Sequence, residues 1–152
     1  MTRPIPLARF LTPDDAEPPL GSLAVDPAEF TEVRHRAPAG FVVRELRGSR
    51  MRTVSGLFDE FAAAFQFPYY FGANKDAFDE CLRDLDESLG AATGYLAAIR
   101  DSAELLAEQP AERGWFADAM RDGAEYWARR EVRFRVVLQG EPAPVRAVPL
   151  TL

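Results

Sequence analysis

The segment Phe67–Leu82, with the sequence FPYYFGANKDAFDECL, places aromatic side chains next to carboxylates. Tyr70 comes shortly before Asp76, Asp79 and Glu80. An exposed tyrosine beside carboxylates is the composition of a hot spot that binds a cationic surface. No histidine and no glycine-rich phosphate loop lies near these acids in the sequence, so the segment lacks the partners of an activated nucleophile. The residue types therefore indicate a site for a basic protein.

The acids fall on the outer face of a helix that the sequence predicts from about Lys75 to Leu89. Asn74 suits the N-cap position, because its side-chain oxygen can accept from a free N–H of the first turn, and Gly72 allows a sharp turn before it. At about 100° per residue, the buried face consists of Phe78, Cys81, Leu82, Leu85 and Leu89. The outer face carries six acids against Lys75 and Arg83. A solvated helix face with pairs such as Asp79–Arg83 is the alternative interpretation.

Hydrophobic periodicity predicts the elements that must position this helix. Strands are expected at 41–46, 95–100 and 133–139, and helices at 54–65, 75–89, 102–109 and 112–130. Strands separated by helical crossovers imply parallel pairing. The prediction is an α/β domain, residues 39–142, with a small three-stranded parallel sheet and about four helices.

The chain outside this domain has a different composition. Seven of the twelve prolines in the whole sequence precede residue 40. Residues 1–38 are therefore predicted to be a proline-rich extension, either a loose arm or a partly ordered wrap. The apolar residues that could attach it to the domain are Phe10, Leu11, Leu20, Leu23, Val25 and Phe30. Residues 143–152 are predicted to be an irregular tail.

Composition narrows the function classes. The formal charge of −6 disfavours direct binding of nucleic acid and favours a basic protein partner. Cys81 is the only cysteine and His35 the only histidine, so no disulfide can form within the chain and no zinc site is expected. No apolar run reaches the length of a signal peptide or a transmembrane helix. We expect a cytoplasmic protein without cofactor, metal or membrane contact.

The segment PYYFGANKDAFDECL resembles the signature of the barstar family, the intracellular protein inhibitors of barnase-like ribonucleases. The matching positions are Pro68, Tyr70, Phe71, Gly72, Asn74, Asp76, Ala77, Phe78, Glu80, Cys81 and Leu82. The similarity extends over residues 41–139, including the first strand and helix, and the family fold agrees with the predicted element order. This chain has Asp79 where the best-known member has Trp, and Glu80 where it has Asp.

The resemblance implies a function and a set of contacts. In the family, the second helix and the loop before it enter the ribonuclease active site, and an acid of that helix takes the place of the substrate phosphate. That acid aligns with Glu80, and its aligned partners are Tyr70 and Asp76. An acid of the last helix often joins them, for which Asp122 is the first candidate and Glu125 the second. The expected partner-binding residues are Tyr70, Gly72, Asn74, Asp76, Asp79, Glu80, Arg83 and Asp122.

Three function classes follow from these observations. The first is an immunity-type inhibitor that blocks the cationic active site of a ribonuclease or toxin. The second is an adaptor of the same fold that binds a basic partner other than a nuclease. The third is an enzyme with paired carboxylates as general acid and base, which the sequence disfavours because the acids lie on a convex helix face. We therefore expect a binding protein without catalytic residues.

Overall fold

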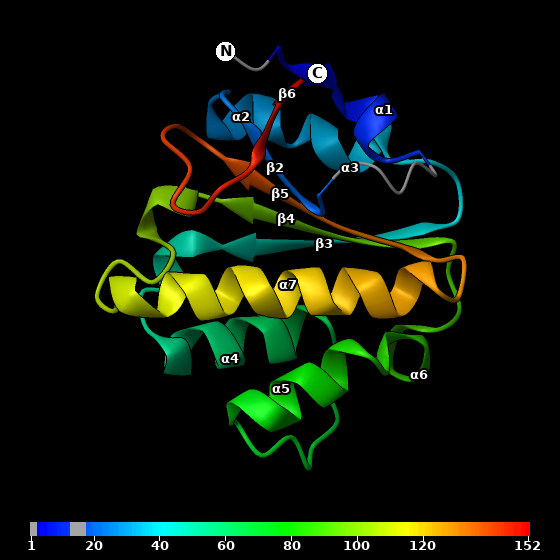
Figure 1. Ribbon diagram of the computed structural model, residues 1–152, viewed down its shortest axis with the longest axis vertical. Helices are drawn as coiled ribbons and strands as arrows, with labels where there is room; N and C mark the ends of the chain where they lie inside the picture. Colours follow the sequence, from blue (N-terminus) through cyan, green and yellow to red (C-terminus); the bar gives the residue numbers. More distant parts are fainter. Residues whose placement is uncertain (1–2, 13–17) are drawn as a thin grey trace.

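One sheet of parallel strands runs through the molecule. The computed structural model describes residues 3–12 and 18–152, and within them six strands pair in the order β1-β6-β2-β5-β4-β3 (Figure 1). The strands are β1 Ile5–Pro6, β2 Leu20–Leu23, β3 Phe41–Arg47, β4 Gly94–Arg100, β5 Arg133–Gln139 and β6 Val148–Thr151. All neighbouring strands pair in parallel.

Helices cover both faces of this sheet. They are α1 Leu7–Phe10, α2 Pro27–Phe30, α3 Glu32–Arg36, α4 Val54–Ala64, α5 Lys75–Leu82, α6 Leu85–Leu89 and α7 Arg113–Ala128. In Figure 1, α4 to α7 lie on one side of the strands and α1 to α3 on the other. Alternate residues of β4 serve the two layers: Tyr95, Ala97 and Ile99 pack in the core with α4, α5 and α7, and Leu96 and Ala98 pack in the core with α1 to α3.

The three predicted strands are confirmed as β3, β4 and β5. β4 is buried along nearly its whole length, which is why its sequence is a continuous apolar run rather than an alternating one. Its central residue Ala97 pairs with Arg44 of β3 and with Val136 of β5. The α/β class and the parallel sheet are therefore as expected.

The prediction of only three strands is wrong, because the extension and the tail contribute β1, β2 and β6. Leu23 of β2 pairs with Gln139 of β5 on one side and with Leu150 of β6 on the other. The tail is therefore not irregular over Val148–Thr151. The strands added by these segments are two to four residues long, and β2 contains Gly21 and Ser22. Such short segments carry too little periodicity to be recognised before their pairing is known.

The extension builds a second hydrophobic core against the sheet. Asp26 caps α2 by accepting from the backbone N–H of Glu29 at 2.8 Å, and Pro27 occupies the first turn. All but one of the predicted anchors are buried, namely Phe10, Leu11, Leu20, Leu23 and Phe30, whereas Val25 is half-buried. In residues 3–12 and 18–38 these buried side chains pack against the sheet; positions 1–2 and 13–17 lie outside the described residues.

The helix expected at 102–109 is also absent. A short 3-10 helix, Ser102–Glu104, stands at its start, and Leu106 has a positive φ of 55°. The N–H groups of Leu106 and Glu108 donate to the carbonyls of Met51 and Arg52, at 2.7 and 3.0 Å. These bonds to a distant loop replace the local ones that a helix would need.

If the extension is part of the folded core, Phe30→Ala should lower the free energy of unfolding by about 3 kcal/mol, since the ring is buried and its removal leaves a cavity. Urea unfolding followed by circular dichroism measures this. Glu29→Ala is the control, because Glu29 is the exposed neighbour in the same helix. Equal midpoints for the two variants would mean that the extension does not pack on the sheet.

Candidate functional site: an acidic helix and its aromatic loop

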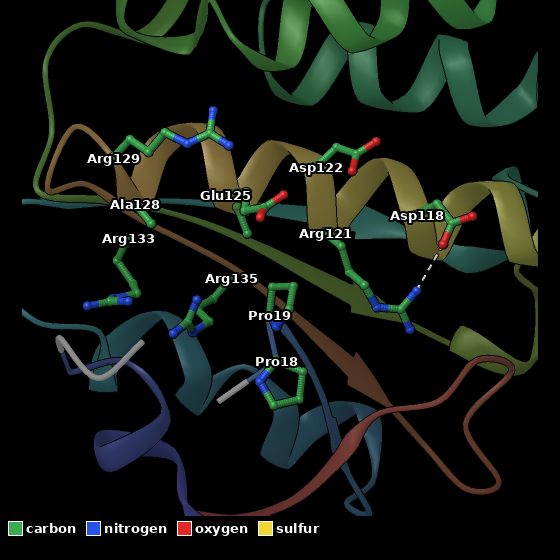
Figure 2. Close-up of a pocket in the computed structure, with 11 residues that line it drawn as sticks. Pro18, Pro19, Asp118, Arg121, Asp122, Glu125, Ala128, Arg129, Arg133 and Arg135 are labelled. Atoms are coloured by element: carbon green, nitrogen blue, oxygen red, sulfur yellow. Dashed lines mark hydrogen bonds and ion pairs between the residues drawn. The ribbon is translucent and has the colours of Figure 1, made fainter. Parts of the chain in front are cut away.

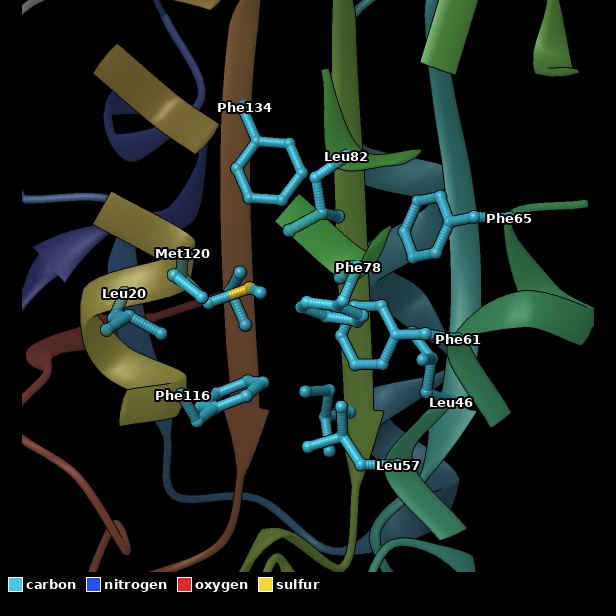
Figure 3. Packing of buried hydrophobic residues seen from close by; sticks show 14 of the residues in the cluster. Leu20, Leu46, Leu57, Phe61, Phe65, Phe78, Leu82, Phe116, Met120 and Phe134 are labelled. Carbon is cyan, nitrogen blue, oxygen red and sulfur yellow. The ribbon is translucent and has the colours of Figure 1, made fainter. Parts of the chain in front are cut away.

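A cluster of aromatic rings fixes the orientation of α5. Phe78 is fully buried, and its ring centroid lies 5.2 Å from that of Phe61, 5.6 Å from that of Phe58 and 5.6 Å from that of Trp115. Figure 3 shows Phe78 and Leu82 reaching from α5 into the core. Because this face is held by α4 and α7, Asp76 and Glu80 on the opposite face are exposed.

The start of α5 is capped as predicted. The side-chain oxygen of Asn74 accepts from the backbone N–H of Ala77 at 2.8 Å. Asp76 lies in the first turn, where the helix dipole favours a carboxylate. Lys75 is directed to α7: its Nζ lies 2.7 Å from Glu112 and 5.0 Å from the ring centroid of Trp115. Lys75 therefore neutralises Glu112, which lies outside the acidic face of α5.

The turn before α5 differs from the prediction for Gly72. The left-handed residue is Ala73, with a φ of 49°, whereas Gly72 is not among the residues of positive φ. A Cβ on Gly72 would lie 3.2 Å from the side-chain nitrogen of Asn74. The glycine therefore leaves room for the capping side chain, and the turn itself is made by its neighbour.

The single helix predicted for 75–89 is wrong, because the chain breaks it after Leu82. The indole N–H of Trp127 donates to the carbonyl of Leu82 at 2.8 Å in a buried contact. In a continuous helix that carbonyl would accept from the N–H of Asp86. The N–H groups of Arg83 and Asp84 instead make tighter bonds to residues three positions earlier, and α6 starts at Leu85.

This break leaves a cavity of about 310 Å³ between the aromatic loop and the two helices. Its lining consists of Gln66, Pro68, Tyr70, Glu80, Cys81, Asp84, Glu87 and Ser88. Three carboxylates therefore surround a space that Tyr70 borders. Asp84 and Glu87 are missing from the predicted partner-binding set, although the sequence analysis counted them among the acids of the outer face. Their spacing of four and seven residues from Glu80 was the sequence signal, since residues at such intervals lie on one face of a helix.

A second acidic group lies on the other side of α5. Burial raises the pKa of Asp79; Arg83 acts to lower it, while Asp122 and Asp76 raise it further. Asp122 belongs to α7, so an acid of the last helix acts electrostatically on α5. Asp122 also lines the groove that Pro18 and Pro19 border, and Figure 2 shows its carboxylate pointing away from these prolines. The predicted Asp79–Arg83 pair is not a close ion pair in the described part of the chain.

The loop before α5 exposes its tyrosines. The exposed fraction is 100% for Tyr69 and 72% for Tyr70, whereas Phe71 is half-buried. The ring of Phe71 packs edge-on against Phe58 and Phe67, with centroids 5.8 and 5.2 Å apart. The predicted exposure of an aromatic beside the acidic helix is therefore confirmed, and Phe71 attaches the loop to the core.

A groove of about 910 Å³ on the far side of α7 is a weaker candidate (Figure 2). Arg129, Arg133 and Arg135 lie at one end, and Asp118 forms an ion pair with Arg121 at 3.1 Å at the other. The groove therefore carries both signs of charge, whereas acids predominate on the outer face of α5. Its lining includes Glu125, the second candidate from the last helix. Asp122 is the better candidate for the acid of the last helix that joins the site, because its charge raises the pKa of Asp79 on α5.

The structure offers no metal centre and no membrane span among the residues it describes. No group of three or more histidine, cysteine or acidic residues has the arrangement of a metal site there. Nor is any helix both long and apolar enough to span a membrane.

Comparison with known proteins assigns the family. The family described as Barstar (barnase inhibitor) matches residues 41–139, from the start of β3 to the end of β5. A search of curated proteins finds no match. Since the match spans well over half of the chain, this protein belongs to the barstar family, which is an inhibitor family. The matched region contains α5, α7 and the aromatic loop, but not β1, β2 or β6.

Asp79→Asn should stabilise the protein at neutral pH. Because the pKa of Asp79 is raised in the folded state, its carboxyl group holds a proton more tightly in the folded chain than in the unfolded chain. The resulting stability is present below the ordinary aspartate pKa of 3.8 and is lost as the pH rises through the folded-state value. We expect a gain of about 0.5 kcal/mol at neutral pH, the size of a like-charge contact on a helix.

Urea unfolding at neutral and acidic pH measures this gain, which should vanish at acidic pH. Asp59→Asn is the matched control, because Asp59 is exposed on α4. A loss of stability in Asp79→Asn at neutral pH would contradict the assigned repulsion.

Proposed function

We propose that this protein inhibits a barnase-type ribonuclease by inserting α5 and its aromatic loop into the basic active site of the enzyme. The observation that carries the proposal is the outer face of α5. Asp76 and Glu80 are exposed there, next to Tyr70, on a helix whose opposite face is fixed by the buried Phe78. Membership of an inhibitor family supports the same conclusion.

The chemistry of the target explains why acids are needed. A ribonuclease must stabilise the negative charge of a phosphodiester transition state, so its site presents several cationic side chains. Carboxylates on a helix supply negative charge at a similar place but contain no bond that the enzyme can cleave. In this proposal Glu80 takes the central position of the substrate phosphate, Asp76 and Asp79 flank it, and Asp122 extends the acidic surface from α7.

The remaining site residues shape or border this surface. Asn74 caps the helix, and Gly72 leaves space for that cap. Arg83 lowers the pKa of Asp79, so it limits the repulsion within the acidic group. Because α5 is held by packing and capping before any partner arrives, little conformational entropy is lost on binding.

The repulsion at Asp79 is itself an argument for binding. Burial raises the pKa of its carboxyl group, and the like charges of Asp122 and Asp76 raise it further, which is a cost to the isolated protein. A partner that brings positive side chains to this place would relieve the repulsion and gain attraction.

A protein that protects a cell from its own ribonuclease acts in the cytoplasm. Cys81, which is free and buried, would stay reduced in that compartment.

Glu80→Ala should weaken inhibition strongly. Loss of a carboxylate paired with buried cations costs about 2 kcal/mol or more, so the inhibition constant should rise at least about thirtyfold. A barnase-type ribonuclease assayed with a fluorogenic RNA substrate gives this value. Glu32→Ala is the matched control, because Glu32 is an exposed acid on α3, away from α5.

If both variants inhibit like the unaltered chain, α5 is not the docking element. If the unaltered chain captures a basic protein that has no ribonuclease activity, the adaptor interpretation replaces the inhibitor one.

Association with the ribonuclease should depend strongly on salt, whereas dissociation should change less. Raising NaCl from about 50 to about 500 mM shortens the screening length and removes the long-range attraction between the acidic face and the basic cleft. Stopped-flow fluorescence should show the association rate falling at least about tenfold. An association rate that does not change with salt would exclude electrostatic steering.

A further inference from the structure

Tyr69 is the most exposed large hydrophobic side chain of the described residues, and it does not pack in the fold. Its exposed fraction is 100%, and the other exposed member of this class is its neighbour Tyr70. The two rings contact each other edge to face, with centroids 5.5 Å apart and an interplanar angle of 83°. Tyr69 belongs to neither hydrophobic core. A side chain that contributes nothing to folding is a candidate for contact with another molecule.

The loop holds Tyr69 in this exposed position. On one side, the N–H of Phe67 donates to the carbonyl of Ala62 at 3.0 Å; on the other, the N–H of Phe71 donates to the carbonyl of Pro68 at 2.9 Å. The rings of Phe67 and Phe71 contact each other and the core. Tyr69 therefore sits on a loop that is attached at both ends, so its exposure is a fixed feature of the surface.

The surroundings of the tyrosine pair select a cation. Tyr70 shares a cavity with the carboxylates of Glu80, Asp84 and Glu87. An aromatic ring in a negative field binds a guanidinium or ammonium group through its face, and acids nearby strengthen the attraction. The protein itself contains such a pairing, since the guanidinium of Arg130 lies 3.7 Å from the ring centroid of Tyr126.

The helix cannot supply this aromatic contact. The outward residues of α5 nearest the loop are charged, with Asp76, Asp79 and Glu80 in the positions that face away from Phe78. Interfaces usually combine charge with at least one aromatic anchor, because charge pairs alone gain little net affinity after desolvation. Only the loop offers such anchors on this side of the described structure.

We propose that Tyr69 is a partner contact that receives an arginine or lysine side chain on its ring face, at the outer edge of the acidic site. This inference rests on the proposed function and adds a specificity element to it. The partner must carry a basic side chain outside its catalytic cleft, in addition to the cations that meet Glu80. Tyr69 and Tyr70 then act together, with Tyr70 bordering the acidic cavity and Tyr69 extending the surface beyond it.

Three variants of Tyr69 test the proposal by isothermal titration calorimetry against a catalytically inactive barnase-type ribonuclease. Tyr69→Phe keeps the aromatic face and should bind within twofold of the unaltered chain. Tyr69→Leu keeps apolar area but loses the face, so it should bind at least tenfold more weakly, close to Tyr69→Ala. Since the side chain is fully exposed, all three variants should unfold at the same urea midpoint.

Glu80→Ala, measured in the same series, separates this inference from the proposed function. If Glu80→Ala weakens binding but all Tyr69 variants bind normally, the Tyr69 contact is wrong and the inhibitor function stands. If Tyr69→Leu binds as well as Tyr69→Phe, the contact is not of the cation–ring type and the proposal fails. Absence of binding by the unaltered chain would remove both.

Discussion

The burial of Phe78 among the rings of α4, α7 and the aromatic loop is the contact on which the site depends. Its ring meets Phe58, Phe61, Phe67 and Trp115 within about 6 Å between centroids. Since these rings come from α4, the loop and α7, the burial fixes α5 relative to these three segments. The acids lie on the opposite face of α5. Because α5 is held by this packing, it presents them in one arrangement.

Trp127 adds a second constraint that shapes the site. It donates to the carbonyl of Leu82, the last residue of α5, and two residues separate α5 from α6. Asp84, Glu87 and Glu80 border one cavity beside this break. A hydrogen bond from α7 thus decides the form of a surface on α5 and α6. Repulsion among Asp76, Asp79 and Asp122 is tolerated because the rest of the core is well packed.

The extension and the tail enlarge the sheet outside the region that matches the family. Strands β1, β2 and β6 extend the sheet beyond β5, at the edge away from β3, while α1 to α3 cover the face that α4 and α7 leave open. The family match ends at Gln139. The side-chain N–H of Gln139 donates a hydrogen bond to the backbone carbonyl of Val25, in the extension, at 2.7 Å. The added segments therefore complete a second core behind the sheet, and the acidic helix remains free on the other side.

Local sequence determined the elements whose signals are contained in one segment. The apolar runs of β3 to β5, the Asn74 cap and the outward position of Asp76 and Glu80 depend on periodicity and on one short-range hydrogen bond, so they were predictable. Only the tertiary structure decided the break after Leu82, the approach of Asp122 to Asp79 and the addition of β1, β2 and β6. Each of these depends on contacts between residues far apart in the chain, and such contacts leave no periodic trace in a single sequence.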